Sequence, residues 1–140
     1  MMRILILNGP NLNMLGKREP TIYGNTSFEE YFIVLKTKVN CELEYIQSNY
    51  EGDLITEIQQ AKENGFDGIV LNAGAYTHTS IAIHDAILSV DTPVVEVHIS
   101  NVYKRETYRH TSFLSPVCVG TIVGFGLKGY EYAVDWLTCK

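Results

Sequence analysis

The chain alternates short runs of Ile, Val and Leu with stretches whose apolar residues recur at helical spacing. The apolar runs predict five strands, at residues 3–8, 43–48, 68–72, 94–98 and 117–123. Such nearly continuous apolar strands suit a sheet that is covered on both faces, and regular strand–helix alternation implies right-handed crossovers between parallel strands. The sequence therefore predicts an α/β fold: a doubly wound, five-stranded parallel sheet in a three-layer α/β/α sandwich.

Four helices are predicted between and after these strands. Three of their apolar faces are Phe28, Phe32, Leu35 and Val39; Leu54, Ile55, Ile58 and Ala61; and Leu127, Tyr130, Val134 and Leu137. Thr26-Ser27 supplies an N-cap for the first, and Ser80 can cap a helix at residues 81–88. Gly65 can close the helix that precedes it as a C-cap.

Length and composition limit the kind of protein. A chain of 140 residues is expected to be one domain, spanning residues 1–140. A net charge of −5 argues against a general nucleic-acid binder. No apolar run reaches the roughly 18 residues of a membrane span, and the N-terminal run is too short for a signal-peptide core. Cys41, Cys118 and Cys139 are odd in number and lack CxxC spacing, which favours a reducing cytoplasm and argues against a metal site.

A polar cluster follows each of three predicted strands directly. Open parallel sheets bind ligands beyond the carboxyl ends of their strands, so these clusters are expected to meet at one site. Glu96 and His98 share a strand face because side chains alternate with period two. The carboxylate can then hold one imidazole nitrogen and leave the other to transfer a proton. A buried structural ion pair is the alternative interpretation.

A long loop after the first strand carries Arg18 and Tyr23. A free tyrosine has a pKa of about 10 and is a poor base at neutral pH, but a nearby guanidinium favours the phenolate. Tyr23, with Arg18 beside it on a loop that closes over the site, is therefore a candidate base. In the alternative, Tyr23 only packs and Arg18 is solvated. We expect residues 15–24 to be the most mobile part of the free protein.

Two further sets of polar residues are candidates for binding a ligand. Asn72 and His78 stand before a helix N-terminus, which suits a hydroxyl or carboxylate. Arg105 and Arg109 share a face if their segment is helical, and either could clamp a carboxylate; a solvated basic face is the alternative. The GxGxxG match at residues 124–129 is set aside, because the chain ends before an acidic residue could hold a ribose. No cofactor and no metal is expected.

Together these segments resemble the type II 3-dehydroquinate dehydratases, over essentially the whole chain. The matching segments are Asn8-Gly9-Pro10-Asn11-Leu12, Arg18-Glu19-Pro20, Tyr23-Gly24, Gln47-Ser48-Asn49, Glu51-Gly52, Asn72-Ala73-Gly74, Thr77-His78-Thr79-Ser80, Glu96-Val97-His98-Ile99-Ser100-Asn101 and Leu114-Ser115-Pro116. The resemblance implies a flavodoxin-like fold. It also implies a hydro-lyase of the shikimate pathway that converts 3-dehydroquinate to 3-dehydroshikimate through an enolate, for aromatic amino acid biosynthesis.

The resemblance also implies catalytic roles. Tyr23 resembles the base that removes a proton from C2, and Arg18 the lid arginine that activates it. Asn11 stands where the family holds a water against the enolate oxygen. His98 resembles the acid that protonates the departing C1 hydroxyl, oriented by Glu96. No lysine follows a predicted strand as a candidate for the imine route of the type I enzymes.

Substrate binding and assembly are implied in the same way. The residues that resemble substrate anchors are Asn72, His78, Ile99, Ser100 and Arg109. Asp85 resembles an acidic residue that reaches a neighbouring subunit's site, and the family implies a homo-oligomer, a dodecamer of trimers. His84, where arginine is common, and His110-Thr111, where the family is more basic, depart from the pattern. A non-catalytic flavodoxin-like binding or receiver module is the rival interpretation, but a receiver's acidic cluster is missing after the first strand.

Overall fold

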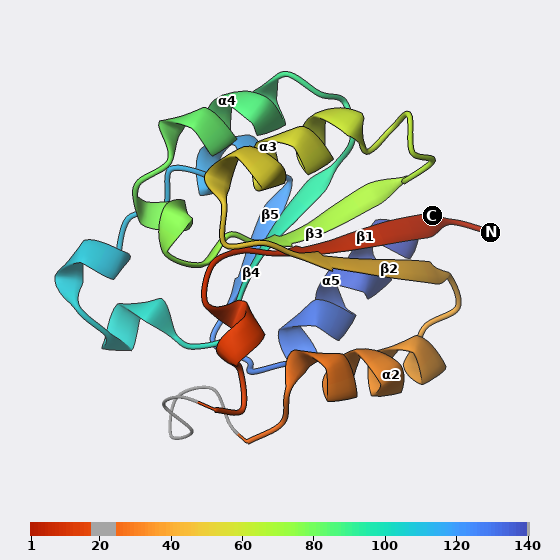
Figure 1. Ribbon diagram of the computed structural model, residues 1–140, viewed down its shortest axis with the longest axis horizontal. Coiled ribbons are helices and arrows are strands. Elements are labelled where there is room, and N and C mark those ends of the chain that lie inside the picture. Colours follow the sequence, from red (N-terminus) through yellow and green to blue (C-terminus); the bar gives the residue numbers. More distant parts are fainter. Residues whose placement is uncertain (18–24, 140) are drawn as a thin grey trace.

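The computed structural model describes residues 1–17 and 25–139, and they build an open parallel sheet between two layers of helices (Figure 1). The strands are β1 (Arg3–Asn8), β2 (Glu42–Gln47), β3 (Gly68–Asn72), β4 (Val94–His98) and β5 (Gly120–Val123). Their order across the sheet is β2-β1-β3-β4-β5, and every neighbouring pair is parallel. This is the strand order of flavodoxin-like proteins, so the predicted fold class is confirmed.

Helices cover both faces of the sheet, as Figure 1 shows. α3 (Glu51–Gln60) and α4 (Ile81–Leu88) pack on one face, and α2 (Phe28–Lys38) and α5 (Lys128–Thr138) pack on the other. The central strands β1, β3 and β4 are buried almost throughout, whereas the edge strands β2 and β5 are partly exposed. No helix in the described part of the chain is both long enough and apolar enough to span a membrane.

Strand β1 shows why the apolar runs have no polar face. Ile4 and Ile6 belong to the core under α2 and α5, while Leu5 and Leu7 belong to the core under α3 and α4, and all four are fully buried. Burying an aliphatic side chain of this kind contributes about 1.5–3 kcal/mol. After Arg3 at its start, the strand has no polar residue until Asn8, where it reaches the carboxyl edge of the sheet.

Helix caps and strand ends differ from the sequence prediction in a few places. Ser27 and Ser80 cap their helices, accepting hydrogen bonds from the N–H groups of Glu30 and Ile83. Helix α3 ends at Gln60, and Gly65, at φ 87°, closes the turn that follows instead of capping the helix directly. The last strand begins at Gly120 and not at residue 117, because residues 115–117 form a 3-10 turn around Pro116.

Close contact between two loops shapes the carboxyl edge of the sheet. A Cβ at Gly9 would lie 2.6 Å from the carbonyl oxygen of Ala73, so only glycine fits there. The N–H of Gly9 donates to the Asn72 carbonyl over 2.7 Å. The loops after β1 and β3 are therefore held together next to Pro10, Asn72 and Gly74, which line the pocket described next.

Candidate active site

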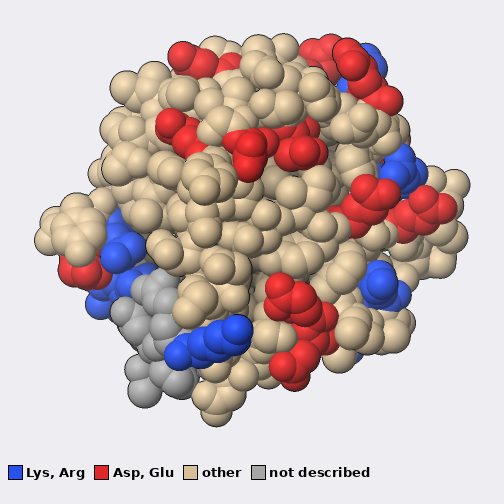
Figure 2. All heavy atoms as spheres, in the orientation of Figure 1, with Lys and Arg blue, Asp and Glu red and all other residues tan. Residues whose placement is uncertain are grey.

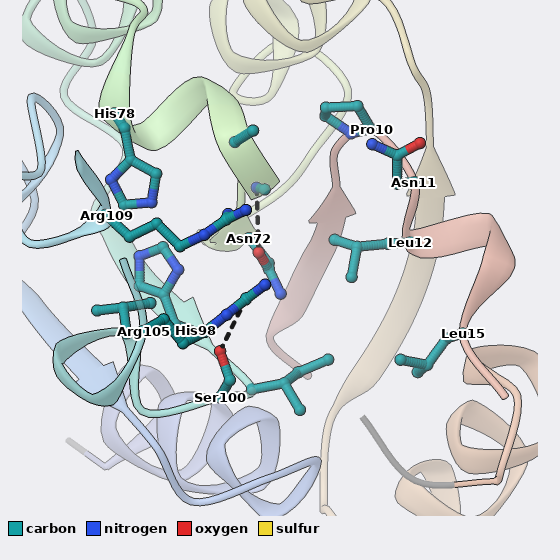
Figure 3. Close-up of a pocket in the computed structure, with 14 residues that line it drawn as sticks. Pro10, Asn11, Leu12, Leu15, Asn72, His78, His98, Ser100, Arg105 and Arg109 are labelled. Atoms are coloured by element: carbon teal, nitrogen blue, oxygen red, sulfur yellow. Dashed lines mark hydrogen bonds between the residues drawn. The ribbon is translucent and has the colours of Figure 1, made fainter. Parts of the chain in front are cut away.

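A pocket opens at the carboxyl edge of the sheet, where the loops after β1, β3 and β4 meet (Figure 3). Its lining comprises Pro10, Asn11, Leu12, Leu15, Asn72, Gly74, Ala75, His78, His98, Ile99, Ser100, Val102, Arg105 and Arg109. In Figure 3 the two histidines and the two arginines approach from one side, Pro10, Asn11, Leu12 and Leu15 from the other, and Asn72 lies between them. The pocket thus combines an apolar wall with a cationic one.

Charge is unevenly distributed over the surface. On the face drawn in Figure 2, acidic side chains lie at the top, at the right and in a group at the lower centre, while basic ones form a group at the left and lower left and stand singly at the right. The left side is where the short helices η3 (Val102–Lys104) and η4 (Thr107–Arg109) lie in Figure 1, in cyan. A protein with net charge −5 therefore keeps a positive region beside this pocket, which favours an anionic ligand there.

His98 is held from behind by Glu96, and both residues belong to β4. Nε2 of His98 lies 2.5 Å from Oε2 of Glu96, whose side chain is fully buried. Burial raises the pKa of Glu96, but the hydrogen bond and charge of His98 and the hydrogen bonds from Ser115 and Ser112 outweigh it and lower the pKa below its ordinary value. The carboxylate is therefore ionised at neutral pH. Its contact with Nε2 leaves Nδ1 as the ring nitrogen available to a ligand.

His78 forms the neighbouring part of the wall. Its ring lies 6.2 Å from that of His98 and nearly parallel to it, and its Nδ1 is 2.8 Å from the carbonyl oxygen of Thr111. Because a carbonyl only accepts, Nδ1 carries the proton and Nε2 is left as an acceptor. Burial, reinforced by the charges of His98 and Arg109, lowers the pKa of His78. A neutral His78 can thus accept a hydrogen bond from a ligand hydroxyl.

Asn72 is fixed at the centre of the pocket by a buried network. Its Nδ2 donates to the Tyr130 phenol oxygen over 2.9 Å, and Tyr130 donates in turn to Oδ1 of Asn8 over 2.8 Å. The N–H of Gly74 donates to Oδ1 of Asn72. Burial raises the pKa of Tyr130, so it remains a neutral phenol. These bonds leave one hydrogen of the Asn72 amide for a ligand.

Two arginines supply the positive charge of the pocket. Nε of Arg109 lies 2.9 Å from Glu106, and Nη1 of Arg105 lies 3.4 Å from the Ser100 hydroxyl. Hydrogen bonds, first from Tyr108 and then from Arg109, lower the pKa of Glu106 to about 2. Arg105 and Arg109 do not share a helical face, because residues 105–109 are not one helix: η3 ends at Lys104 and η4 begins at Thr107. Both arginines nevertheless line the pocket, since the chain turns around its rim between them.

Asn11 stands on the opposite rim in a left-handed conformation, at φ 70°. It is the one non-glycine residue with positive φ in the described part of the chain. Its N–H donates to Oδ1 of Asn49, which also accepts a hydrogen bond from Gln47. Asn tolerates this conformation better than most residues, yet such backbone strain concentrates at functional sites. The loop after β2 therefore holds Asn11 in place.

The structure brings together most of the residues predicted for the site. Those that line the pocket are Asn11, Asn72, His78, His98, Ile99, Ser100 and Arg109, with Glu96 directly behind His98. Asp85 does not line it: this exposed residue of α4 contacts His84, with Oδ1 and Nδ1 2.9 Å apart. Arg18 and Tyr23 lie outside the described residues, as does most of the predicted lid.

Sequence reasoning missed other residues of the site. Arg105 was weighed only as an alternative clamp, and Ser112, Ser115 and Tyr130 were given no role at the site. A serine before Pro116 reads as an ordinary turn, so only the fold reveals its contact with Glu96. Within residues 1–17 and 25–139, no group of three or more His, Cys, Asp or Glu side chains is placed to hold a metal ion.

Comparison with known proteins places this geometry in context. Residues 2–138 match the family model described as dehydroquinase class II. The chain is 56% identical to a 3-dehydroquinate dehydratase of an Exiguobacterium species, covering 97% of this chain and 94% of the relative. It is 53% identical to the one of Bacillus pumilus, covering 100% and 97%. The type II dehydroquinase structure from Butyrivibrio crossotus superposes with a TM-score of 0.91 at 55% identity, covering 97% of both chains.

Proposed function

The chain belongs to the class II dehydroquinase family, and from that premise we propose that it is a type II 3-dehydroquinate dehydratase. It removes water from 3-dehydroquinate to give 3-dehydroshikimate through an enolate. As a hydro-lyase it serves the shikimate pathway and hence aromatic amino acid biosynthesis. The observation that carries this proposal is the buried Glu96–His98 pair, which opens into a pocket with two arginines.

The reaction needs a base, a group that stabilises the enolate, and an acid. A base removes the proton at C2, next to the C3 ketone, and the electrons move onto the ketone oxygen. They then return to expel the C1 hydroxyl as water, once an acid has protonated it. Three separate groups therefore have to surround one ring, and residues from several strand ends can do so.

His98 is the proposed acid. When protonated, it donates from Nδ1 to the C1 hydroxyl, while Nε2–H keeps its hydrogen bond to Glu96. Glu96 stabilises the imidazolium before the transfer and fixes the ring orientation throughout. Glu96 thus orients His98 as a carboxylate orients the catalytic histidine in other enzymes, except that His98 here donates a proton.

Tyr23 is the proposed base and Arg18 its activator, both assigned by resemblance to the family because they lie outside the described residues. Asn11 is proposed to hold a water against the enolate oxygen. Its position across the pocket from His98 supports this, because the enolate and the leaving group are on different parts of the substrate ring.

The remaining lining residues are proposed to bind the substrate. Arg109 supplies positive charge for the carboxylate and the ring hydroxyls, together with the backbone of Ile99 and Ser100. Asn72 offers its remaining N–H, and His78 offers Nε2 as an acceptor. A polyhydroxylated carboxylate is the class of ligand that this combination of donors and acceptors fits.

Assembly and location complete the proposal. We propose that residues 1–140 form a single catalytic domain, working in the cytoplasm as a trimer-based dodecamer in which Asp85 completes a neighbour's site. The exposed position of Asp85 on α4 supports this role, since its side chain is available to another subunit. Light scattering at dilute concentration tests it: an active monomer would contradict the assembly and confine the site to one chain.

Ultraviolet absorbance tests the activity itself. The enone product absorbs and the substrate does not, so adding 3-dehydroquinate should produce a continuous rise in absorbance. Substituting Asn for His98 in a matched preparation should remove that rise. A flat trace from the unsubstituted protein would refute the proposed function.

A further inference from the structure

Glu96 is held by more than His98. Oε2 of this buried carboxylate lies 2.9 Å from the Ser112 hydroxyl, and Oε1 lies 2.6 Å from the Ser115 hydroxyl. Thr121 stands behind Ser115, 3.0 Å away from oxygen to oxygen. We call Ser112, Ser115 and Thr121 the hydroxyl cluster. Its members come from the segment after η4 and from β5, so folding alone brings them to β4.

The direction of the Ser112 hydrogen bond follows from its other contacts. The N–H groups of Leu114 and Ser115 both donate to Ser112 Oγ, each over 3.0 Å. A hydroxyl has two acceptor sites and one proton. Both acceptor sites are occupied, so the proton of Ser112 points to Glu96. Ser112 therefore donates its hydrogen bond to an ionised carboxylate, which can only accept hydrogen bonds.

Ser115 also donates a hydrogen bond to Glu96, but to the other carboxylate oxygen, Oε1. Its distance of 2.6 Å to Oε1 is that of a strong hydrogen bond, whereas Thr121 is 3.4 Å from the same atom. Thr121 is thus better placed to donate to Ser115 than to Glu96. Thr121 and Ser115 thus form a donor chain that ends on Oε1 of the carboxylate, and Ser112 donates to the carboxylate separately.

The titratable groups around Glu96 are two histidines and a neutral thiol, so the negative charge of this region is on Glu96. His98 faces the carboxylate from the pocket side, and His78 stacks beyond it. On the other side, burial and then the charge of Glu96 raise the pKa of the Cys118 thiol to about 12, so the thiol is neutral. The charge of Arg109 acts on His78, whose pKa it helps to lower.

We propose that Ser112 and Ser115 are positioning residues for the dehydration step, which hold Glu96 ionised with Oε2 aimed at Nε2 of His98. This keeps Nδ1 of His98 as the nitrogen that meets the leaving hydroxyl. Neither serine lines the pocket, so neither binds the substrate. The inference rests on the proposed function in one respect, the role of His98 as acid.

Kinetics of Ser115→Ala and Ser112→Ala test the role. Each should lower kcat on the order of tenfold with little change in KM, because a hydrogen bond to a charged group is lost outside the pocket. Ser115→Thr, which retains a hydroxyl, should restore most of kcat. Ser89→Ala is the control: its hydroxyl donates to the Ala86 carbonyl, far from Glu96, and its loss should change nothing.

A second measurement does not depend on activity. Nitrogen-15 spectra of the imidazole rings should show His98 as a single tautomer protonated at Nε2, and a mixture in Ser115→Ala. The signal is assigned by its absence in His98→Asn. If wild-type protein is inactive but the tautomer changes in Ser115→Ala, the proposed function fails and the positioning role stands. An unchanged tautomer in Ser115→Ala overturns the positioning role, whatever happens to kcat. Ser115→Ala is decisive even if Ser112→Ala does not fold, because only Ser112 also accepts the two backbone bonds.

Discussion

Nδ2 of Asn72 donates a hydrogen bond to the phenol oxygen of Tyr130 over 2.9 Å, although 58 positions separate the two residues. A residue of α5, in the layer beneath the sheet, thereby sets the orientation of an amide at the centre of the pocket. Tyr130 is completely buried and reaches no ligand itself. The network connects the packing of the fold directly to the geometry of the site.

Tyr130→Phe should therefore affect both stability and binding. It leaves buried polar groups of Asn72 and Asn8 without this partner, which costs about 1–3 kcal/mol. Chemical denaturation should show that loss, and KM for 3-dehydroquinate should rise because the Asn72 amide keeps only its hydrogen bond from the Gly74 N–H. Tyr132→Phe, on an exposed side chain of the same helix, is the matched control. Equal effects of the two substitutions would contradict the role of the network.

Acidification should destabilise the protein through Glu96. Its pKa is lowered in the folded state, so the unfolded chain takes up a proton first, near the ordinary glutamate value of about 4.3. The stabilisation is complete above that pH and is lost as the pH falls through the folded pKa. Glu96→Gln should remove this part of the pH dependence of the unfolding free energy, measured from about pH 6 downwards. Glu63→Gln, on the surface, should leave it in place; an identical acid response of both variants would refute the assignment.

Arg109 should matter through the shape of its guanidinium as well as its charge. Arg109→Ala should cost about 1.5–3 kcal/mol of substrate binding, seen as a rise in KM. Arg109→Lys should recover only part of this, because an ammonium lacks the planar fork that binds a carboxylate and contacts Glu106 at once. Lys104→Ala, which removes a charge of η3 outside the pocket lining, should have little effect. Full recovery with lysine would show that charge alone is needed.

Removal of metal ions should leave activity unchanged. The proposed acid, base and enolate stabiliser form a complete set for this elimination without a Lewis acid, so dialysis against a chelator is expected to have no effect. Borohydride with substrate should not inactivate the enzyme, because no imine forms. Activity lost on chelation and restored by a divalent cation would refute the first expectation, and inactivation by borohydride the second.

The sequence predicted the central strands better than the edge of the sheet. Strands β1, β3 and β4 have the predicted bounds because both faces are buried, so each is a mainly apolar run with a polar residue at its end, interrupted in β4 by Glu96. Strand β5 was started too early, since Val117, Cys118 and Val119 continue the apolar run although Pro116 has turned the chain. Apolar character alone does not separate a strand from a buried turn.

Site residues could be predicted where strand position determines contact. Glu96 and His98 are two positions apart on one strand, so their contact follows from local geometry. Ser112 and Ser115 lie 16 and 19 positions from Glu96, and their contact depends on how the chain returns to β5. The residues alone made Tyr23 a candidate base through its neighbour Arg18, and resemblance to a known family supplied the reaction in which it would act.

Hydrogen exchange at C2 of the substrate tests the division of labour between Tyr23 and His98 most directly. With 3-dehydroquinate in deuterated water, His98→Asn should exchange the C2 hydrogen while eliminating water slowly. Tyr23→Phe should do neither, with turnover reduced by roughly two to four orders of magnitude. Exchange at C2 by Tyr23→Phe at the normal rate, or its loss in His98→Asn alone, would contradict the assignment of base and acid.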